Sequence, residues 1–394
     1  MEIKFIDINK EEIIVNLPKT EKLAPKDISF VNKEDIISVE IPEGIYYITD
    51  ATFSGFKNLE NVILPRTLKH ICEDAFQGCG LKSIEIPSSV GYIAKYAFSN
   101  CINLEFIDLS KTKIMCLYEG IFMANAKLKT VLLPSRLMEI QMRAFFGCRS
   151  LTEIVIPDNV NIIGSYAFFN CTSLKNIVLP ESVTSVGEKA FKDTLYYNTT
   201  SNWENGYLKI GNVIIEASQW LCPSVLTLHG KIVIADCAFQ GNSGVNDIHF
   251  TGKDFYAGYN CFGNSSIKSM IIIAENEVVM GSYAFQGSLL NCITIKGKEI
   301  TLCERFSDET FEMKLMKLEC DTLVLQDEAL ADITIDTLHI QSNKKLNLCI
   351  DKKSAENIEI NNFYIKDNHI SDTFYIPNDV IFFEIINSLI PTLF

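Results

Sequence analysis

The segment Ser150–Cys171 reads SLTEIVIPDNVNIIGSYAFFNC and holds one complete copy of a unit that recurs along the chain. Its most regular member is a phenylalanine, which is Phe168 in this copy. We call the equivalent residues the repeat phenylalanines, and they are Phe53, Phe76, Phe98, Phe122, Phe145, Phe168, Phe191, Phe239, Phe262 and Phe285. Their spacing is 22 to 24 residues, apart from 48 residues between Phe191 and Phe239. A period held this long predicts a repeat protein whose units stack along one axis.

The first half of the unit has the pattern of a short strand. Leu151, Ile154 and Ile156 include a pair with period two, as in a strand with one buried face. Pro157 follows and ends the strand, because it has no N–H for a ladder that continues from coil to coil. The sequence therefore predicts one strand per unit, and stacked units would form a parallel sheet.

The second half of the unit predicts another side of the coil. Val160 and Ile163 are three residues apart, and we expect both to point inward. Gly164 is expected to permit a turn, and residues 166–171 are expected to form a short helical turn that carries Phe168 into the core. A single coil could not bury this apolar set, whereas stacked coils bury it against their neighbours.

Four cysteines share one position of the unit. Cys79, Cys101, Cys148 and Cys171 each come three residues after a repeat phenylalanine. A disulfide or metal ladder is one interpretation. Equivalent side chains of stacked coils should lie about 4.8 Å apart, however, which suits stacked small apolar groups better. We therefore predict buried free thiols and a reducing compartment.

Composition excludes several kinds of partner and site. The net charge of −14 argues against nucleic acid or an anionic lipid surface as a partner, because both need basic faces. The 13 cysteines include no CxxC pair, and the 5 histidines have no metal or triad spacing. We expect no cofactor and no metal.

The chain also has no recognisable export or membrane signal. Its start, MEIKFID, lacks a basic region followed by an apolar run, and nowhere are there 18 consecutive apolar residues. We expect no membrane insertion and a cytoplasmic location as encoded. A cell-surface location reached by a non-standard route is the alternative.

The unit Leu-x-x-Ile-x-Ile-Pro-x-x-Val-x-x-Ile-Gly-x-x-Ala-Phe-x-x-Cys resembles the leucine-rich repeat of BspA-like proteins, over roughly residues 36–295. The segment Trp203–Ile215, WENGYLKIGNVII, is similar to the hairpin-like insertion of a widened coil in that family. The resemblance implies a right-handed leucine-rich-repeat superhelix of about 23-residue coils. A parallel β-sheet would follow one face, with short strands or helical turns on the other.

The expected organisation follows from the repeat and the resemblance. Residues 1–35 form an N-terminal cap, and residues 36–295 form the leucine-rich repeat solenoid, with a modified, widened coil at about 195–235. Residues 296–376 are degenerate repeats that continue the stack. Residues 377–394 form a C-terminal cap or tail. The caps are expected because an open solenoid end exposes apolar surface and an unpaired strand edge.

The resemblance implies adhesion or protein binding and no enzymatic activity. We therefore predict a non-enzymatic protein-binding scaffold whose partner is another protein, with self-association possible. The alternative is a passive structural or assembly spacer within a larger complex.

The outward position of each strand predicts where a partner binds. Side chains alternate along a strand, so the residue between two inward ones points out of the sheet. Apolar or aromatic residues occupy this outward slot at six places, which are our partner-binding candidates: Leu132, Val155, Val178, Ile63, His249 and Ile271. Three of these fall on consecutive coils and predict a contiguous apolar patch. The alternative is that β-branched residues stand there only because strands favour them.

Overall fold

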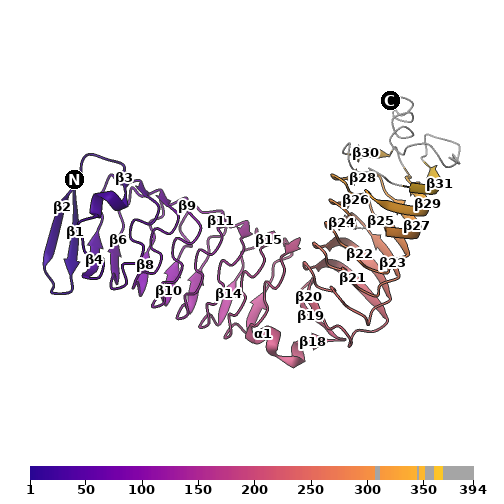
Figure 1. Cartoon of the computed structure of the whole chain (residues 1–394), viewed down its shortest axis with the longest axis horizontal. Coiled ribbons are helices and arrows are strands. Elements are labelled where there is room, and N and C mark those ends of the chain that lie inside the picture. Colours follow the sequence, from indigo (N-terminus) through magenta and orange to yellow (C-terminus); the bar gives the residue numbers. More distant parts are fainter. Residues whose placement is uncertain (307–310, 344–345, 351–358, 367–394) are drawn as a thin grey trace. The chain divides into compact units, whose positions relative to one another are not determined.

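The computed structural model describes residues 1–306, 311–343, 346–350 and 359–366, shown in colour in Figure 1. Over these described residues the chain is a β-solenoid of about 14 turns with parallel sheets and little helix, which confirms the predicted fold class. It divides into two compact units, Met1–Asn202 and Trp203–Phe394. The boundary between the units, at residues 202 and 203, falls inside the segment expected to be a widened coil.

Unit 1 begins with a hairpin that pairs with the first repeat strand. Strand β1 (Glu2–Asp7) is antiparallel both to β2 (Glu12–Asn16) and to β4 (Ile36–Glu40). Between β2 and β4 lie β3 (Lys22–Leu23) and the 3-10 helix η1 (Pro25–Ile28). Strand β1 therefore occupies the edge of β4 that a first coil would otherwise leave unpaired, as a cap must.

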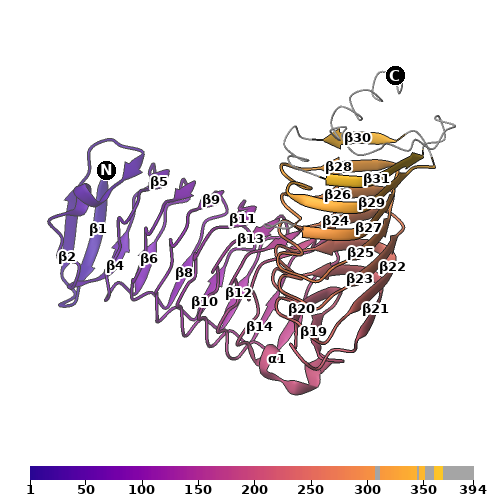
Figure 2. The ribbon, with the colours of Figure 1, turned by 45° about the vertical axis from the view of Figure 1, so that its right-hand side comes forward.

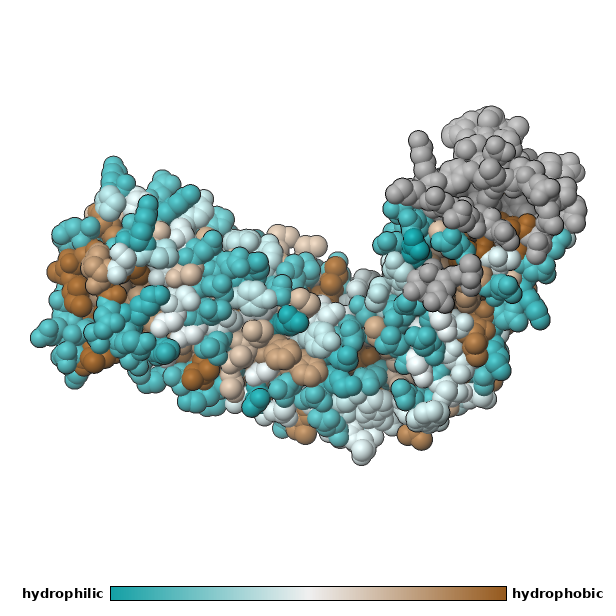
Figure 3. All heavy atoms as spheres, in the orientation of Figure 1, coloured by the Kyte–Doolittle hydropathy of each residue, from teal (hydrophilic) through white to brown (hydrophobic). Residues whose placement is uncertain are grey.

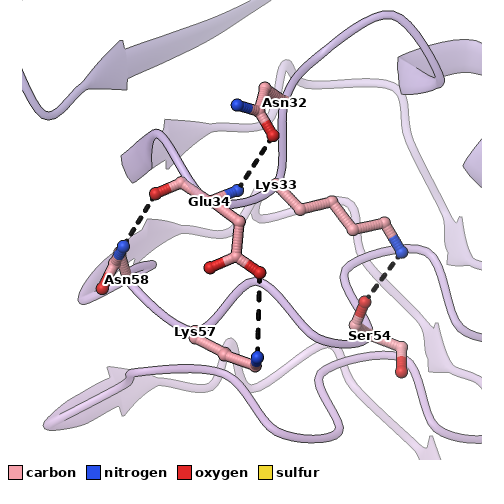
Figure 4. Close-up of polar contacts among 6 residues, drawn as sticks. All are labelled: Asn32, Lys33, Glu34, Ser54, Lys57 and Asn58. Atoms are coloured by element: carbon pink, nitrogen blue, oxygen red, sulfur yellow. Dashed lines mark hydrogen bonds and ion pairs between the residues drawn. The ribbon is translucent and has the colours of Figure 1, made fainter.

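Polar contacts join the loop before β4 to the coil that follows, as Figure 4 shows. The Lys33 ammonium donates to the Ser54 carbonyl at 3.0 Å, and the Asn58 amide donates to the Glu34 carbonyl at 2.7 Å. Lys57 lies 3.8 Å from the Glu34 carboxylate, but these two side chains are 72% and 60% exposed. Such an exposed ion pair contributes little, so the two bonds to carbonyl groups do more to hold the loop.

The first face of unit 1 carries one three-residue strand per coil. These strands are β6 (Asn61–Ile63), β8 (Ser83–Glu85), β10 (Phe106–Asp108), β12 (Thr130–Leu132), β14 (Glu153–Val155) and β16 (Asn176–Val178). All pair in parallel, as predicted, but in separate ladders: β4–β6, β8–β10–β12 and β14–β16. In the described part of unit 1 the ladder is thus interrupted between β6 and β8 and between β12 and β14.

The second face of unit 1 carries two-residue strands. They are β5 (Tyr47–Ile48), β7 (His70–Ile71), β9 (Tyr92–Ile93), β11 (Cys116–Leu117), β13 (Glu139–Ile140), β15 (Ile162–Ile163) and β17 (Ser185–Val186). They form two parallel sheets, β3–β5–β7–β9 and β11–β13–β15–β17. Val160 and Ile163 are fully buried, which confirms the predicted inward direction of both side chains.

The repeat phenylalanines form a stacked column inside each unit. All are fully buried, and in unit 1 the rings of Phe145 and Phe191 lie on either side of Phe168, with centroids 5.1 and 5.2 Å away. The expected helical turn at residues 166–171 is wrong, because this segment is a non-helical turn. Tyr166 and Asn170 adopt φ angles of 58° and 59° there, and such left-handed residues do not continue a helix.

Gly164 has a different role from the one expected. Its backbone is not left-handed, so the turn does not need its conformational freedom. A Cβ atom at Gly164 would instead lie 2.5 Å from the backbone nitrogen of Met142 in the preceding coil. Glycine is needed because neighbouring coils approach each other closely at this point.

The cysteines of the repeat are buried, as predicted, and they also form hydrogen bonds. The Cys171 thiol donates to the Phe145 carbonyl at 3.1 Å, and the Cys148 thiol donates to the Phe122 carbonyl at 3.2 Å. Asn125 takes the same position in its coil, and its amide donates to the carbonyl of the preceding repeat phenylalanine at 3.0 Å. All 13 cysteines are free. In these three coils of unit 1, this position therefore ties the coil to the one before it.

Unit 1 ends with α1 (Leu195–Asn198) and the 3-10 helix η2 (Thr200–Asn202), and unit 2 begins with an antiparallel meander. The meander consists of β18 (Trp203–Glu204), β19 (Tyr207–Ile210) and β20 (Val213–Ala217). It matches the hairpin-like segment that the family resemblance implied at this place.

The rest of unit 2 is a parallel stack with longer strands, seen in order in Figure 2. One row holds β21 (Val225–Ile234), β22 (Asp247–Ala257), β23 (Ser269–Ala274), β25 (Cys292–Lys296), β27 (Phe311–Glu319), β29 (Ile333–Gln341) and β31 (Glu359–Lys366). The other row holds β24 (Glu277–Met280), β26 (Glu299–Leu302), β28 (Thr322–Leu325) and β30 (Asn347–Ile350). The parallel stack thus continues through the described residues after 296. The tail expected at 377–394 lies outside the described residues.

Candidate interaction surface

The outward slot of the first face is apolar on three consecutive coils. Leu132, Val155 and Val178 are the last residues of β12, β14 and β16, and they are 43%, 81% and 75% exposed. The residue before each of them is buried, as alternation along a strand requires. Val155 and Val178 stand directly opposite each other in the parallel ladder of β14 and β16.

The other three predicted residues lie apart from this group. Ile63 is exposed at the end of β6, but Glu85 and Asp108 fill the same slot on β8 and β10 between it and Leu132. His249 and Ile271 are exposed in unit 2, where they are paired in register on β22 and β23. The structure therefore brings three of the six predicted residues together on consecutive strands of one unit.

Phe106 belongs to the same surface and was not predicted. It is the first residue of β10, is exposed, and lies two residues before Asp108, which pairs with Leu132. The prediction considered one outward slot per strand, whereas a three-residue strand has two. The alternation itself could have identified Phe106. We call Phe106, Leu132, Val155 and Val178 the sheet-face patch.

An open cavity of about 510 Å³ lies within the sheet-face patch. Leu132 and Val155 line it, and the ladder is interrupted between their strands, β12 and β14. Its polar lining residues are Ser110, Thr130, Ser135, Glu153, Asp158 and Asn159. The patch is therefore an apolar surface with a recess in it.

Acidic groups lie beside the sheet-face patch. Asp108 accepts a hydrogen bond from the Ser110 N–H at 2.8 Å, and hydrogen bonds from Ser110 lower the pKa of that carboxyl. Glu153 and Asp158 line the cavity. The nearby Lys129 ammonium is 2.7 Å from the Glu105 carboxylate, and its hydrogen bond lowers the pKa of Glu105. The patch thus combines apolar side chains with negative charge.

Cys148 and Cys116 are poorly suited to nucleophilic chemistry. Burial raises the pKa of the Cys148 thiol to about 12. Burial, followed by the nearby Glu139 carboxylate, raises the pKa of Cys116 to about 12 as well. Because the thiolate is the reactive form, these shifts disfavour attack by either sulfur.

Among the described residues, no group of three or more His, Cys, Asp or Glu side chains is placed to hold a metal ion. In that same part of the chain, no helix is long and apolar enough to cross a membrane.

Several solved structures are similar to this chain. A leucine-rich repeat protein from Bacteroides ovatus is 16% identical, with a TM-score of 0.40 over 89% of this chain and 99% of that one. A leucine rich cell surface protein from Faecalibacterium prausnitzii is 18% identical, with a TM-score of 0.38 over 91% and 93%. The leucine-rich repeat protein of T. pallidum is 18% identical, with a TM-score of 0.25 over 66% and 85%. No curated protein matches the sequence.

The family comparison covers most of the chain. The sequence matches the family described as "BspA type Leucine rich repeat region", in six copies, over residues 26–151, 112–220 and 224–335. These ranges contain every repeat phenylalanine and most strands of the parallel sheets, up to the start of β29. The chain belongs to the BspA-type leucine-rich repeat family.

Proposed function

We propose that this protein is a non-enzymatic scaffold that binds another protein on the sheet-face patch. The observation that carries the proposal is the exposure of Val155 and Val178, at 81% and 75%, on paired strands. Leu132 extends the apolar surface to a third coil, so it spans about 10 Å at the usual strand spacing. Contiguous apolar surface of this kind usually marks an interaction site.

Strand propensity is the competing explanation for these residues. β-branched side chains are favoured in strands whether or not anything binds. Propensity accounts for Val155 and Val178, but it does not account for an open cavity beside them. Aromatic and apolar anchors that enter a recess are typical of binding hot spots.

The charges around the patch indicate the partner's chemistry. Asp108, Glu153 and Asp158 place carboxylates next to the apolar side chains. A segment with an apolar anchor flanked by lysine or arginine would complement both features. We propose such a segment as the ligand, in adhesion or in another protein–protein contact.

The test is a triple variant, Leu132→Glu, Val155→Glu and Val178→Glu, with Ile63→Glu as the matched control. Ile63 occupies the same slot of an exposed strand end, outside the patch. We expect the triple variant to lose the partner selected by the wild-type protein, and the control to retain it, with both still folded. Full binding by the triple variant would refute the patch. Failure of the wild-type protein to select any saturable partner would favour a passive spacer.

We also propose a cytoplasmic location. The free thiols of all 13 cysteines suit a reducing compartment. Cell fractionation of the native organism tests this, and recovery of the protein at the cell surface would support the non-standard export route instead.

A further inference from the structure

Within the described residues, no further strand pairs with the outer edge of the N-terminal hairpin. In the sheet order β2–β1–β4–β6, β2 is the terminal strand, and Ile14 at its centre is exposed. Figure 3 shows hydrophobic surface in brown at this end of unit 1. An exposed strand edge with apolar side chains is a template for pairing with another strand.

The register of the hairpin determines which backbone groups face outward. Leu17 donates its N–H to the Met1 carbonyl at 2.8 Å, and Asp7 donates its N–H to the Glu11 carbonyl at 3.0 Å. In an antiparallel ladder hydrogen-bonded and non-hydrogen-bonded pairs alternate. The odd-numbered residues of β2 therefore exchange bonds with β1. Its even-numbered residues, 12, 14 and 16, direct their N–H and C=O groups away from the sheet.

We infer that this edge binds the same edge of a second copy of the chain, antiparallel and centred on Ile14. Ile14 then stands opposite Ile14 of the second copy, and Glu12 stands opposite Asn16 in both directions. Each of these residue pairs exchanges N–H and C=O groups across the interface. The contact is two-fold symmetric, so it closes as a dimer and does not propagate.

The sequence of β2 selects this register over its neighbours. A pairing centred on Glu12 would place two carboxylates directly opposite each other, which is destabilising. It would also set Ile14 against Lys10, whose φ of 66° lies in the hairpin turn. A pairing centred on Asn16 would set Ile14 against Pro18, which has no N–H to donate. The Ile14 centre avoids all of these conflicts.

The buried face of the hairpin also matches itself in this register. Ile13 is half-buried and Val15 is buried, and the pairing sets each of them beside the other in the second copy. The apolar face under β1 and β2 then continues across the interface, and Ile13 loses its remaining exposure to water. Because Ile13, Ile14 and Val15 face apolar residues and Glu12 faces the neutral Asn16 in this register, a second copy is the occupant that the edge fits.

Sedimentation equilibrium of the full chain over a range of concentrations tests the inference. We expect a concentration-dependent dimer for the wild-type protein. Ile14→Lys and Ile14→Glu each place like charges opposite each other, so each variant should be monomeric at concentrations where the wild-type protein is a dimer. An equimolar mixture of the two variants should restore a dimer that contains one copy of each. Ile8→Lys, at an exposed hairpin position outside β2, is the control and should dimerise like the wild-type protein.

Three outcomes would overturn the inference. The first is a wild-type chain that stays monomeric at every concentration. The second is an Ile14→Lys variant that dimerises as well as the wild-type protein. The third is a dimer lost in the Leu132, Val155 and Val178 triple variant but kept in Ile14→Lys, which would place self-association on the sheet-face patch. Because Ile14 is exposed, its substitution should leave the circular dichroism spectrum unchanged, and this separates loss of pairing from loss of fold.

Discussion

Replacing Phe168 with alanine should remove the largest single contribution in its coil. The ring is fully buried and stacked between those of Phe145 and Phe191, at 5.1 and 5.2 Å. A buried aromatic side chain removes about 150–250 Å² from water, and about 25 cal/mol per Å² then gives about 4–6 kcal/mol. Measured aromatic-to-alanine losses are about 3–5 kcal/mol, and we expect the variant to lie in that range.

The Phe168→Ala variant should lose stability in the coils next to residue 168 before it loses stability in the rest of the chain. Coils of a repeat protein couple mainly to their nearest neighbours, so the cavity should loosen the coils on either side first. Native-state hydrogen exchange resolves this, because it reports an opening free energy for each amide. Protection should fall most between residues 145 and 191 and least in the β1–β2 hairpin.

A matched variant and a clear refutation accompany this experiment. Phe106→Ala removes the same side chain from an exposed position and should cost clearly less stability than Phe168→Ala. Unchanged protection around residues 145–191 in Phe168→Ala would show that the phenylalanine column does not hold the coils together. Equal loss of protection along the whole chain would instead refute nearest-neighbour coupling.

Three further predictions concern single positions of the repeat. Gly164→Ala should lower the melting temperature, because its Cβ atom would lie 2.5 Å from the Met142 nitrogen. In the control Gly91→Ala the Cβ atom would lie 3.8 Å from its nearest atom, so the melting temperature should fall far less. Equal melting temperatures of the two variants would contradict the close approach of the coils at Gly164. Burial raises the pKa of the Cys148 thiol from 9.0 to about 12. The contribution of this thiol to stability is therefore fully present below pH 9 and is lost as the pH rises towards 12. Denaturant unfolding measured at several pH values should show this loss in the wild-type protein and a smaller loss in Cys148→Ala. Asn125→Cys should leave the free energy of unfolding unchanged or raise it by about 1 kcal/mol, because the buried Asn125 Oδ1 has no hydrogen-bond partner. Chemical denaturation measures this free energy. A loss above about 1 kcal/mol would mean that the amide stabilises this position better than a thiol does.

The repeat period and the direction of most side chains could be read from the sequence. The spacing of the repeat phenylalanines predicted the solenoid, and period-two alternation predicted that Ile154 is buried and Val155 exposed. Both features can be predicted from the sequence of a single coil, because each coil is buried against neighbours that have the same pattern of apolar residues. The candidate surface followed from the same rule, and Phe106 was missed only because one of two outward slots was considered.

Contacts between coils decided what the sequence did not show. The ladder is interrupted between β12 and β14, and residues of both strands line the cavity of the sheet-face patch, so both features depend on how two neighbouring coils lie. The role of Gly164 likewise depends on the Met142 backbone of another coil. The left-handed φ of Tyr166 could not be predicted, because a tyrosine and not a glycine stands at this position. Apolar periodicity specifies which side chains are buried. The distance between neighbouring backbones is set only when the coils stack, and so the division of the chain at residue 202 and the recess in the sheet-face patch belong to the tertiary structure alone.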